Sequence, residues 1–173
     1  RGYGQVVPQD SLSLVAQVSG QVTDISSSFK TGALVANNTV LARIDDTNYQ
    51  QALASANATY QAAVVSLEEE RLQGIQAKDE WTRSGLDGEP LSALVLREPQ
   101  LKAAQATLDE AEQSVNSAKR DLAFTSLRAP FNALVVSRDI ALGSYVQAGS
   151  AVATLYSADI AEVAIGLSPS QWA

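Results

Sequence analysis

The side chains that could do chemistry in this chain are mainly carboxylates, because the sequence contains no Cys, no His and no Met. Their absence excludes thiol chemistry, imidazole acid-base chemistry and thioether copper sites. The 19 Asp and Glu residues are densest at residues 68–70. Three consecutive helical residues point in different directions, so this run does not make a paired acid-base site. We expect a solvated helix face there, and no catalytic, cofactor or metal site.

Charge and composition disfavour nucleic acid as a partner and give no pattern of a membrane span. The net charge of −7 disfavours nucleic acid, since a phosphate backbone attracts clustered Lys and Arg. No apolar run approaches the roughly 18 residues of a membrane span. The chain begins without Met and stops just after residues 169–172, where another element is expected to begin. We therefore expect an excised or mature fragment of a longer protein.

Two distant β blocks resemble each other. Residues 31–44 align without gaps to residues 142–155, which matches Gly32 with Gly143 and Asn38 with Gly149. Upstream, "GQVTDI" aligns with "ALVVSR" after a length difference of two residues. Asn38 is expected in a left-handed turn conformation. The repeat predicts one β module built from two halves.

Between the blocks, residues 46–127 have the period of a coiled coil. Large residues fall seven apart in two segments, on either side of a Gly- and Pro-containing turn at about 84–91, and a second row is rich in Ala. The pattern predicts an antiparallel helical hairpin with close helix packing. The expected seam residues are Leu53, Tyr60, Leu67, Leu94, Leu101, Leu108, Val115 and Leu122.

Pro99 interrupts the second helical segment and permits two interpretations. Either the helix begins at Pro99, or a helix beginning near residue 91 is kinked there. Matching the lengths of the two helices favours the kinked helix, from 91 to 126. At about 1.5 Å per residue, each helix would then be about 54 Å long.

The stretch "LRAPFNALVV", residues 127–136, marks the return from helix to β module. We expect the helix to end near Leu127, because Pro130 stops helical propagation. For Arg128 two roles remain open. Its charge could stabilise the helix end, or it could bind Asp45 or Asp46 at the base of the hairpin.

The order of half-motif, hairpin, "LRAPF" and half-motif resembles the periplasmic adaptors, or membrane fusion proteins, of tripartite efflux pumps. The stretch "LREPQLKAAQATLDEAEQSVNSAKRDLAFTSLRAPF" is especially similar to adaptors of resistance-nodulation-division transporters. The resemblance implies an α+β fold: a lipoyl-like β-sandwich of two half-motifs, split by a long antiparallel coiled-coil hairpin, with edges of an adjoining β-barrel. The implied segments are 1–10 (barrel edge), 11–45 (first half-motif), 46–127 (hairpin), 128–158 (second half-motif) and 159–173 (start of the barrel).

The resemblance also implies a function. Such adaptors are not enzymes and need no cofactor. They are periplasmic, bridge an inner-membrane efflux transporter and an outer-membrane channel protein, and self-associate into a ring. Attachment to the inner membrane would use a segment outside this fragment. The exported compounds would be drugs or other small molecules.

The hairpin tip is the expected docking site for the channel. Many family members carry there an Arg, a Leu four residues on and a Ser seven further on, and this chain does not match that spacing. The tip is therefore considered as a surface, in which leucines would add apolar burial and an arginine hydrogen bonds. Its candidate residues are Arg83, Ser84, Leu86, Asp87, Leu91 and Ser92. The alternative is a solvated turn, with nearby Trp81 covering the end of the seam.

Alternative functions are an adaptor for an ABC-type exporter or a protein secretion system, a biotinyl or lipoyl carrier, and a plain coiled-coil scaffold. A carrier needs a Lys at the exposed turn between its half-motifs, and the hairpin replaces that turn here. The four lysines lie elsewhere, at Lys30, Lys78, Lys102 and Lys119.

Overall fold

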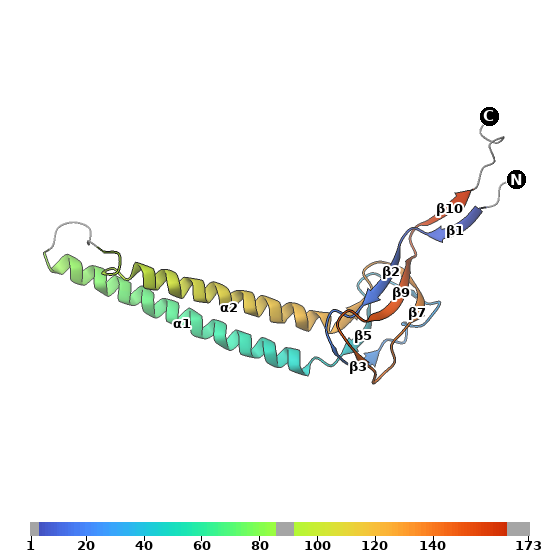
Figure 1. The fold of residues 1–173 in the computed structure, drawn as a ribbon, viewed down its shortest axis with the longest axis horizontal. Coiled ribbons are helices and arrows are strands. Elements are labelled where there is room, and N and C mark those ends of the chain that lie inside the picture. Colours follow the sequence, from blue (N-terminus) through green and yellow to red (C-terminus); the bar gives the residue numbers. More distant parts are fainter. Residues whose placement is uncertain (1–3, 86–91, 166–173) are drawn as a thin grey trace, which may run out of the picture. The chain divides into compact units, whose positions relative to one another are not determined.

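The computed structural model describes residues 4–85 and 92–165, which belong to two compact units (Figure 1). The β unit comprises the described parts of Arg1–Asp46 and Ala123–Ala173. The helical unit comprises the described parts of Thr47–Leu122. The predicted α+β fold class is confirmed, with a sheet-rich unit assembled from both ends of the chain.

The β unit contains two four-stranded sheets. One has the order β2 (Ser11–Val15), β9 (Ala151–Ser157), β7 (Ala133–Arg138) and β4 (Leu34–Val35). The other has the order β6 (Ser126–Arg128), β5 (Val40–Ile44), β3 (Gly20–Ile25) and β8 (Tyr145–Val146). Alternate side chains of the strands form the core. Burying one large apolar side chain there stabilises the fold by about 1.5–3 kcal/mol. Its largest fully buried members are Phe29, Leu41, Ile44, Leu155, Val22, Val135 and Val152.

The two half-motifs exchange their short strands. β4 of the first half pairs with β7 of the second, and β8 of the second half pairs with β3 of the first. Equivalent hydrogen bonds hold the two exchanges: the Gly32 amide donates to the Val135 carbonyl at 2.7 Å, and the Gly143 amide donates to the Val22 carbonyl at 2.8 Å. The internal repeat is thus confirmed, and neither half completes a sheet by itself.

The turn before β5 is repeated before β9. Asn38 has a φ of 64° and Gly149 a φ of 87°, so both lie in the left-handed region, as predicted for Asn38. The Asn38 amide donates to the Ala129 carbonyl at 2.8 Å, and the Gly149 amide to the Ala16 carbonyl at 2.7 Å. The turn of each half is therefore hydrogen-bonded to the end of a strand of the other half.

A separate two-stranded sheet is formed by the first and the last strand of the β unit. β1 (Gly4–Pro8) pairs antiparallel with β10 (Ala161–Ile165). Asn132 is hydrogen-bonded near the point where the chain leaves for β10: its carbonyl accepts from the Ala158 amide at 2.9 Å, and its Nδ2 donates to Asp159 Oδ1 at 3.1 Å. These contacts fix the chain direction between the second half-motif and β10.

The helical unit is made by two helices of unequal length. α1 (Thr47–Arg83) has 37 residues and is about 55 Å long. α2 (Glu98–Phe124) has 27 residues, is about 40 Å long, and runs antiparallel beside α1 (Figure 1). The prediction of a kinked second helix from 91 to 126 was wrong. Residues 93–97 form turns, and Pro99 lies in the first turn of α2, where its missing N–H needs no partner.

The junction after α2 also differs from the prediction. α2 ends at Phe124, and Leu127 belongs to β6, which pairs with β5. Arg128 makes a contact that neither predicted role included: its Nη1 donates to the Asn38 carbonyl at 3.0 Å. The Arg128 side chain thus stabilises the turn before β5.

Candidate docking site at the hairpin tip

The least exposed side chains of each helix follow the alternating spacing of three and four residues that defines one helix stripe. Three of them are almost fully buried: Ala63 is 6%, Ala111 4% and Val115 6% exposed. Small residues in the stripe allow the helices to approach closely. The other members are partly buried. On α1 they are Tyr49, Leu53, Ala56, Tyr60, Leu67, Glu70, Gly74, Ala77 and Trp81, and on α2 they are Leu101, Ala104, Leu108, Ala118 and Leu122.

Leu94, which the heptad count placed in the seam, lies outside α2 and is 61% exposed. It belongs to a strap, residues 92–97, that precedes the helix. Within the strap the Val95 amide donates to the Ser92 carbonyl at 3.1 Å, and the Arg97 amide donates to the Leu94 carbonyl at 3.2 Å. The heptad count was carried one layer too far because the helix begins only at Glu98.

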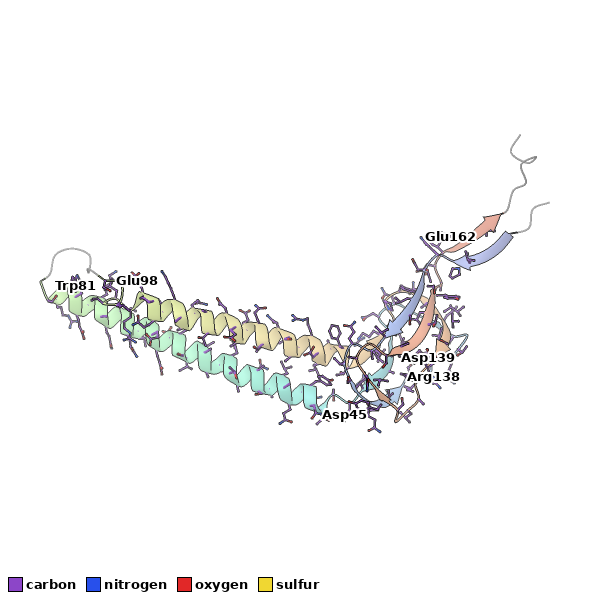
Figure 2. All side chains as sticks on the ribbon, in the orientation of Figure 1. Asp45, Trp81, Glu98, Arg138, Asp139 and Glu162 are labelled. Atoms are coloured by element: carbon purple, nitrogen blue, oxygen red, sulfur yellow. The ribbon has the colours of Figure 1, made fainter. Side chains whose placement is uncertain are left out.

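The described tip residues lie where α1 ends and the strap begins. Arg83 is the last residue of α1, and Ser84 follows it with its Oγ donating to the Trp81 carbonyl at 2.6 Å. Ser92 Oγ accepts from the Leu94 amide at 3.3 Å. All three side chains are exposed. Figure 2 shows Trp81 and Glu98 at the same end of the helical unit. Leu86, Asp87 and Leu91 lie outside the described residues.

An ion pair that was not predicted from the sequence lies beside this tip. Arg97 binds both carboxylate oxygens of Glu70, with Nη2 donating at 2.9 Å and 2.8 Å and Nε at 3.1 Å. The two side chains are only 32% and 22% exposed. The signal was present in the spacing: Glu70 lies seven residues after Ala63, and Arg97 lies seven before Ala104. Both are charged residues in the Ala-rich row of the heptad.

An open groove lies between α1 and the strap. Its lining is mainly polar, and two apolar strap residues contribute to it. The lining residues are Gln73, Gln76, Ala77, Glu80, Leu94, Val95 and Arg97. Since Leu94 and Val95 are 61% and 42% exposed, the strap also presents apolar side chains to solvent. Amide and apolar groups together suit contact with another protein.

Two members of the acidic run on α1 each bind an arginine. Glu68 binds Arg71 one helical turn away at 2.7 Å, and the hydrogen bond from Arg71 lowers the pKa of Glu68 below its ordinary value. The same contact raises the pKa of Arg71. Glu70 is bound to Arg97 instead. Among the described residues, no cluster of three or more Asp and Glu side chains could hold a metal ion.

Over residues 4–85 and 92–165, neither helix combines the length and the apolar character that crossing a membrane requires.

The chain is similar to known proteins in both sequence and fold. The multidrug resistance protein MdtA of Xenorhabdus bovienii is 27% identical over 86% of this chain and 35% of its own length. A putative efflux transporter of Bacteroides eggerthii is similar in structure, with a TM-score of 0.71 and 22% identity over 90% of this chain and 42% of its own. MacA of Actinobacillus actinomycetemcomitans has a TM-score of 0.70 and 22% identity, covering 92% of this chain and 53% of MacA. The membrane fusion protein Spr0693 of Streptococcus pneumoniae has a TM-score of 0.63 and 17% identity, covering 92% of this chain and 64% of Spr0693.

These similarities extend over most of the chain but over only part of the relatives. The chain spans less than half the length of the curated relatives it matches. The structural likenesses establish the fold. Residues 10–158, which include both half-motifs and the hairpin, match the family described as "CzcB-like, barrel-sandwich hybrid domain". The chain therefore belongs to the family of CzcB-like barrel-sandwich hybrid domains of membrane fusion proteins.

Proposed function

We propose that this chain is part of a non-enzymatic periplasmic adaptor that connects an inner-membrane transporter to an outer-membrane channel in an efflux pump. Family membership supports an adaptor, and the name of the relative MdtA supports the export of drugs. The similarity of the hairpin sequence to adaptors of resistance-nodulation-division transporters favours that kind of transporter over an ABC exporter. In the assembled pump, copies of the adaptor form a ring.

The observation that carries this proposal is the form of the helical unit. A 37-residue α1 places the turn about 55 Å along the helix axis from Thr47. Such a helix is several times longer than the average of about 12 residues. The core of the β unit is formed by the side chains of its own strands, so it does not require a helix of this length. A long, paired helix is suited to carrying a contact surface to a distant partner.

The contact surface is the tip. Arg83, Ser84 and Ser92 offer hydrogen-bonding groups that are exposed in the structure. Leu86, Asp87 and Leu91 complete the proposed surface, with the leucines supplying apolar area. Arg83 is suited to carbonyl or carboxylate groups at the mouth of a channel, because its guanidinium presents several donors in one plane.

The β1–β10 sheet supports the remaining part of the proposal. Residues 1–10 and 159–173 would be the edges of an adjoining β-barrel domain, and β1 and β10 pair outside the two four-stranded sheets. Attachment to the inner membrane would use a segment of the parent protein outside this chain.

A dye-efflux assay tests the proposed function. Cells lacking the parent protein are complemented with a tip variant that combines Arg83→Ala, Ser84→Ala, Leu86→Ser, Leu91→Ser and Ser92→Ala. A matched control replaces exposed α1 residues away from the tip by alanine: Gln51, Asn57 and Gln61. We expect the tip variant to lose most of the efflux and the control variant to retain it. Full efflux by a tip variant present at the normal level would contradict docking at the tip.

A further inference from the structure

The Glu70–Arg97 pair is a charged layer within an otherwise apolar and alanine-rich seam. On α1 it follows Ala63 and Leu67, and on α2 it precedes Leu101 and Ala104. Arg97 is the last residue of the strap, since α2 begins at Glu98, so the layer lies where the strap meets the helix. A polar layer in a coiled-coil seam specifies register at a cost in stability. Its position at the end of α2 suggests that it specifies where the helix pair ends.

The backbone at Arg97 supports this role. Its φ of 58° lies in the left-handed region, which is unfavourable for a residue with a Cβ. This conformation makes the strap leave the axis of α2. The helix nevertheless begins directly after Arg97, and the Leu101 amide donates to the Arg97 carbonyl at 3.0 Å. A strained residue at the start of a helix is retained when its surroundings hold it in place. The bidentate contact with Glu70 supplies such a restraint.

The strap lies close to α1 at Gly74. A Cβ at this position would lie 3.5 Å from the Leu96 carbonyl oxygen, which is ordinary van der Waals contact. The strap backbone therefore lies directly against α1, one helical turn beyond Glu70. The ion pair and this close approach together fix the strap on α1 at two successive turns.

Stability alone does not account for a charged layer. Both side chains lose much of their hydration, and exchanging a buried ion pair for apolar residues is often neutral or stabilising. A shift of the helices by one heptad would separate Glu70 from Arg97 and leave two half-buried charges unpaired. The observed register is the one that satisfies both.

We propose that the Glu70–Arg97 layer is a positioning device: it ends the helix pair at Glu98 and fixes the strap against α1. Leu94 and Val95 then remain exposed beside the tip instead of entering the seam. The two residues act through the strap and need no contact with a partner. The use of this device in channel docking rests on the proposed function, whereas its effect on the strap belongs to this chain alone.

Thiol crosslinking in the purified chain tests the device, and the absence of native Cys makes the experiment clean. One pair, Ala77→Cys with Val95→Cys, joins α1 to the strap across the groove that both residues line. A control pair, Ala56→Cys with Ala118→Cys, joins the two helices where both residues line another groove. We expect Arg97→Ala to slow crosslinking of the strap pair about fivefold or more and to leave the control pair unchanged.

Two further variants separate positioning from stability. The apolar variant Glu70→Leu/Arg97→Leu is expected to unfold at the same temperature as the parent or higher, yet to lose rapid strap crosslinking. The swapped variant Glu70→Arg/Arg97→Glu is expected to recover part of it. If Arg97→Ala slows crosslinking of both the strap pair and the control pair, the substitution has disrupted helix pairing itself. Strap crosslinking in the apolar variant then decides whether the proposal holds. Parent-like strap crosslinking in the apolar variant would overturn the proposal.

The outcomes also separate this proposal from the proposed function. Slower strap crosslinking together with unchanged dye efflux by the tip variant would refute docking at the tip and leave the positioning device standing. Unchanged strap crosslinking would refute the device, whatever the efflux assay shows.

Discussion

Gly20 and Ala133 occupy equivalent positions in the two half-motifs, and their neighbours explain why the residues differ. A Cβ on Gly20 would clash with Cγ2 of Ile44, a side chain that is 2% exposed. In the repeat, Leu155 is the equivalent of Ile44, since Val22 pairs with Ile44 as Val135 pairs with Leu155. Leucine is not branched at Cβ and has no Cγ2 methyl group. An alanine therefore fits at 133, and the same alanine would clash at 20.

Gly20→Ala is accordingly expected to lower the free energy of unfolding of the β unit by about 1–3 kcal/mol, the usual cost of forcing extra volume into a packed core. Urea denaturation of the parent and the variant measures this difference. Adding Ile44→Leu should recover part of the loss, because it removes the methyl group that clashes. An equal loss with and without Ile44→Leu would show that the contact with Ile44 is not the cause.

At the scale of elements, the turns before β5 and β9 need a left-handed residue and fill that position differently. Gly149 has a φ of 87° with open space where a Cβ would lie, so backbone strain is the only obstacle to a side chain. Asn38 adopts the same region in the equivalent turn. Asparagine is more tolerant of this conformation than alanine because its short polar side chain can hydrogen-bond locally.

Gly149→Ala should therefore lower the free energy of unfolding by about 1–2 kcal/mol. Gly149→Asn, in the same open space, should cost clearly less. Thermal or urea unfolding of both variants makes the comparison. Equal losses for the two substitutions would contradict an explanation based on backbone strain.

The elements also show what the sequence could predict. The half-motif repeat, the hairpin and the conformation of Asn38 were predictable because each depends on local spacing or on a residue's own conformational preference. The start of α2 was not, since seven-residue counting cannot distinguish a helical Leu94 from an exposed one. The deciding contact, between Arg97 and Glu70, joins residues 27 apart in sequence. The docking role of all six tip residues stays a prediction, and residues 86, 87 and 91 lie outside the described residues.

At the scale of the whole molecule, the hairpin is an insertion into a β unit that is complete without it. The strands on either side of the insertion are neighbours: Arg43 pairs with Ser126, and the Ile44 amide donates to the Thr125 carbonyl at 2.8 Å. The ends of the insertion are therefore close enough for a short connection. The two halves themselves depend on each other, because β4 and β8 each pair with the opposite half.

A chain in which a short Gly-Ser linker replaces residues 47–122 should thus keep a cooperative unfolding transition of the β unit. The separate peptides 1–46 and 123–173 should each show none when alone. Circular dichroism during thermal unfolding distinguishes the three samples. A linked chain without cooperative unfolding would mean that the β unit needs the hairpin for its stability.

The claim that the tip docks on an outer-membrane channel is tested most directly by crosslinking in cells. Ser84→Cys places a thiol at the tip, and Gln61→Cys places one at an exposed position of α1, about 35 Å away along the helix. With a thiol-reactive crosslinker, we predict that Ser84→Cys joins the chain to an outer-membrane channel protein and that Gln61→Cys does not. A channel crosslink from Gln61→Cys, with none from Ser84→Cys, would contradict docking at the tip.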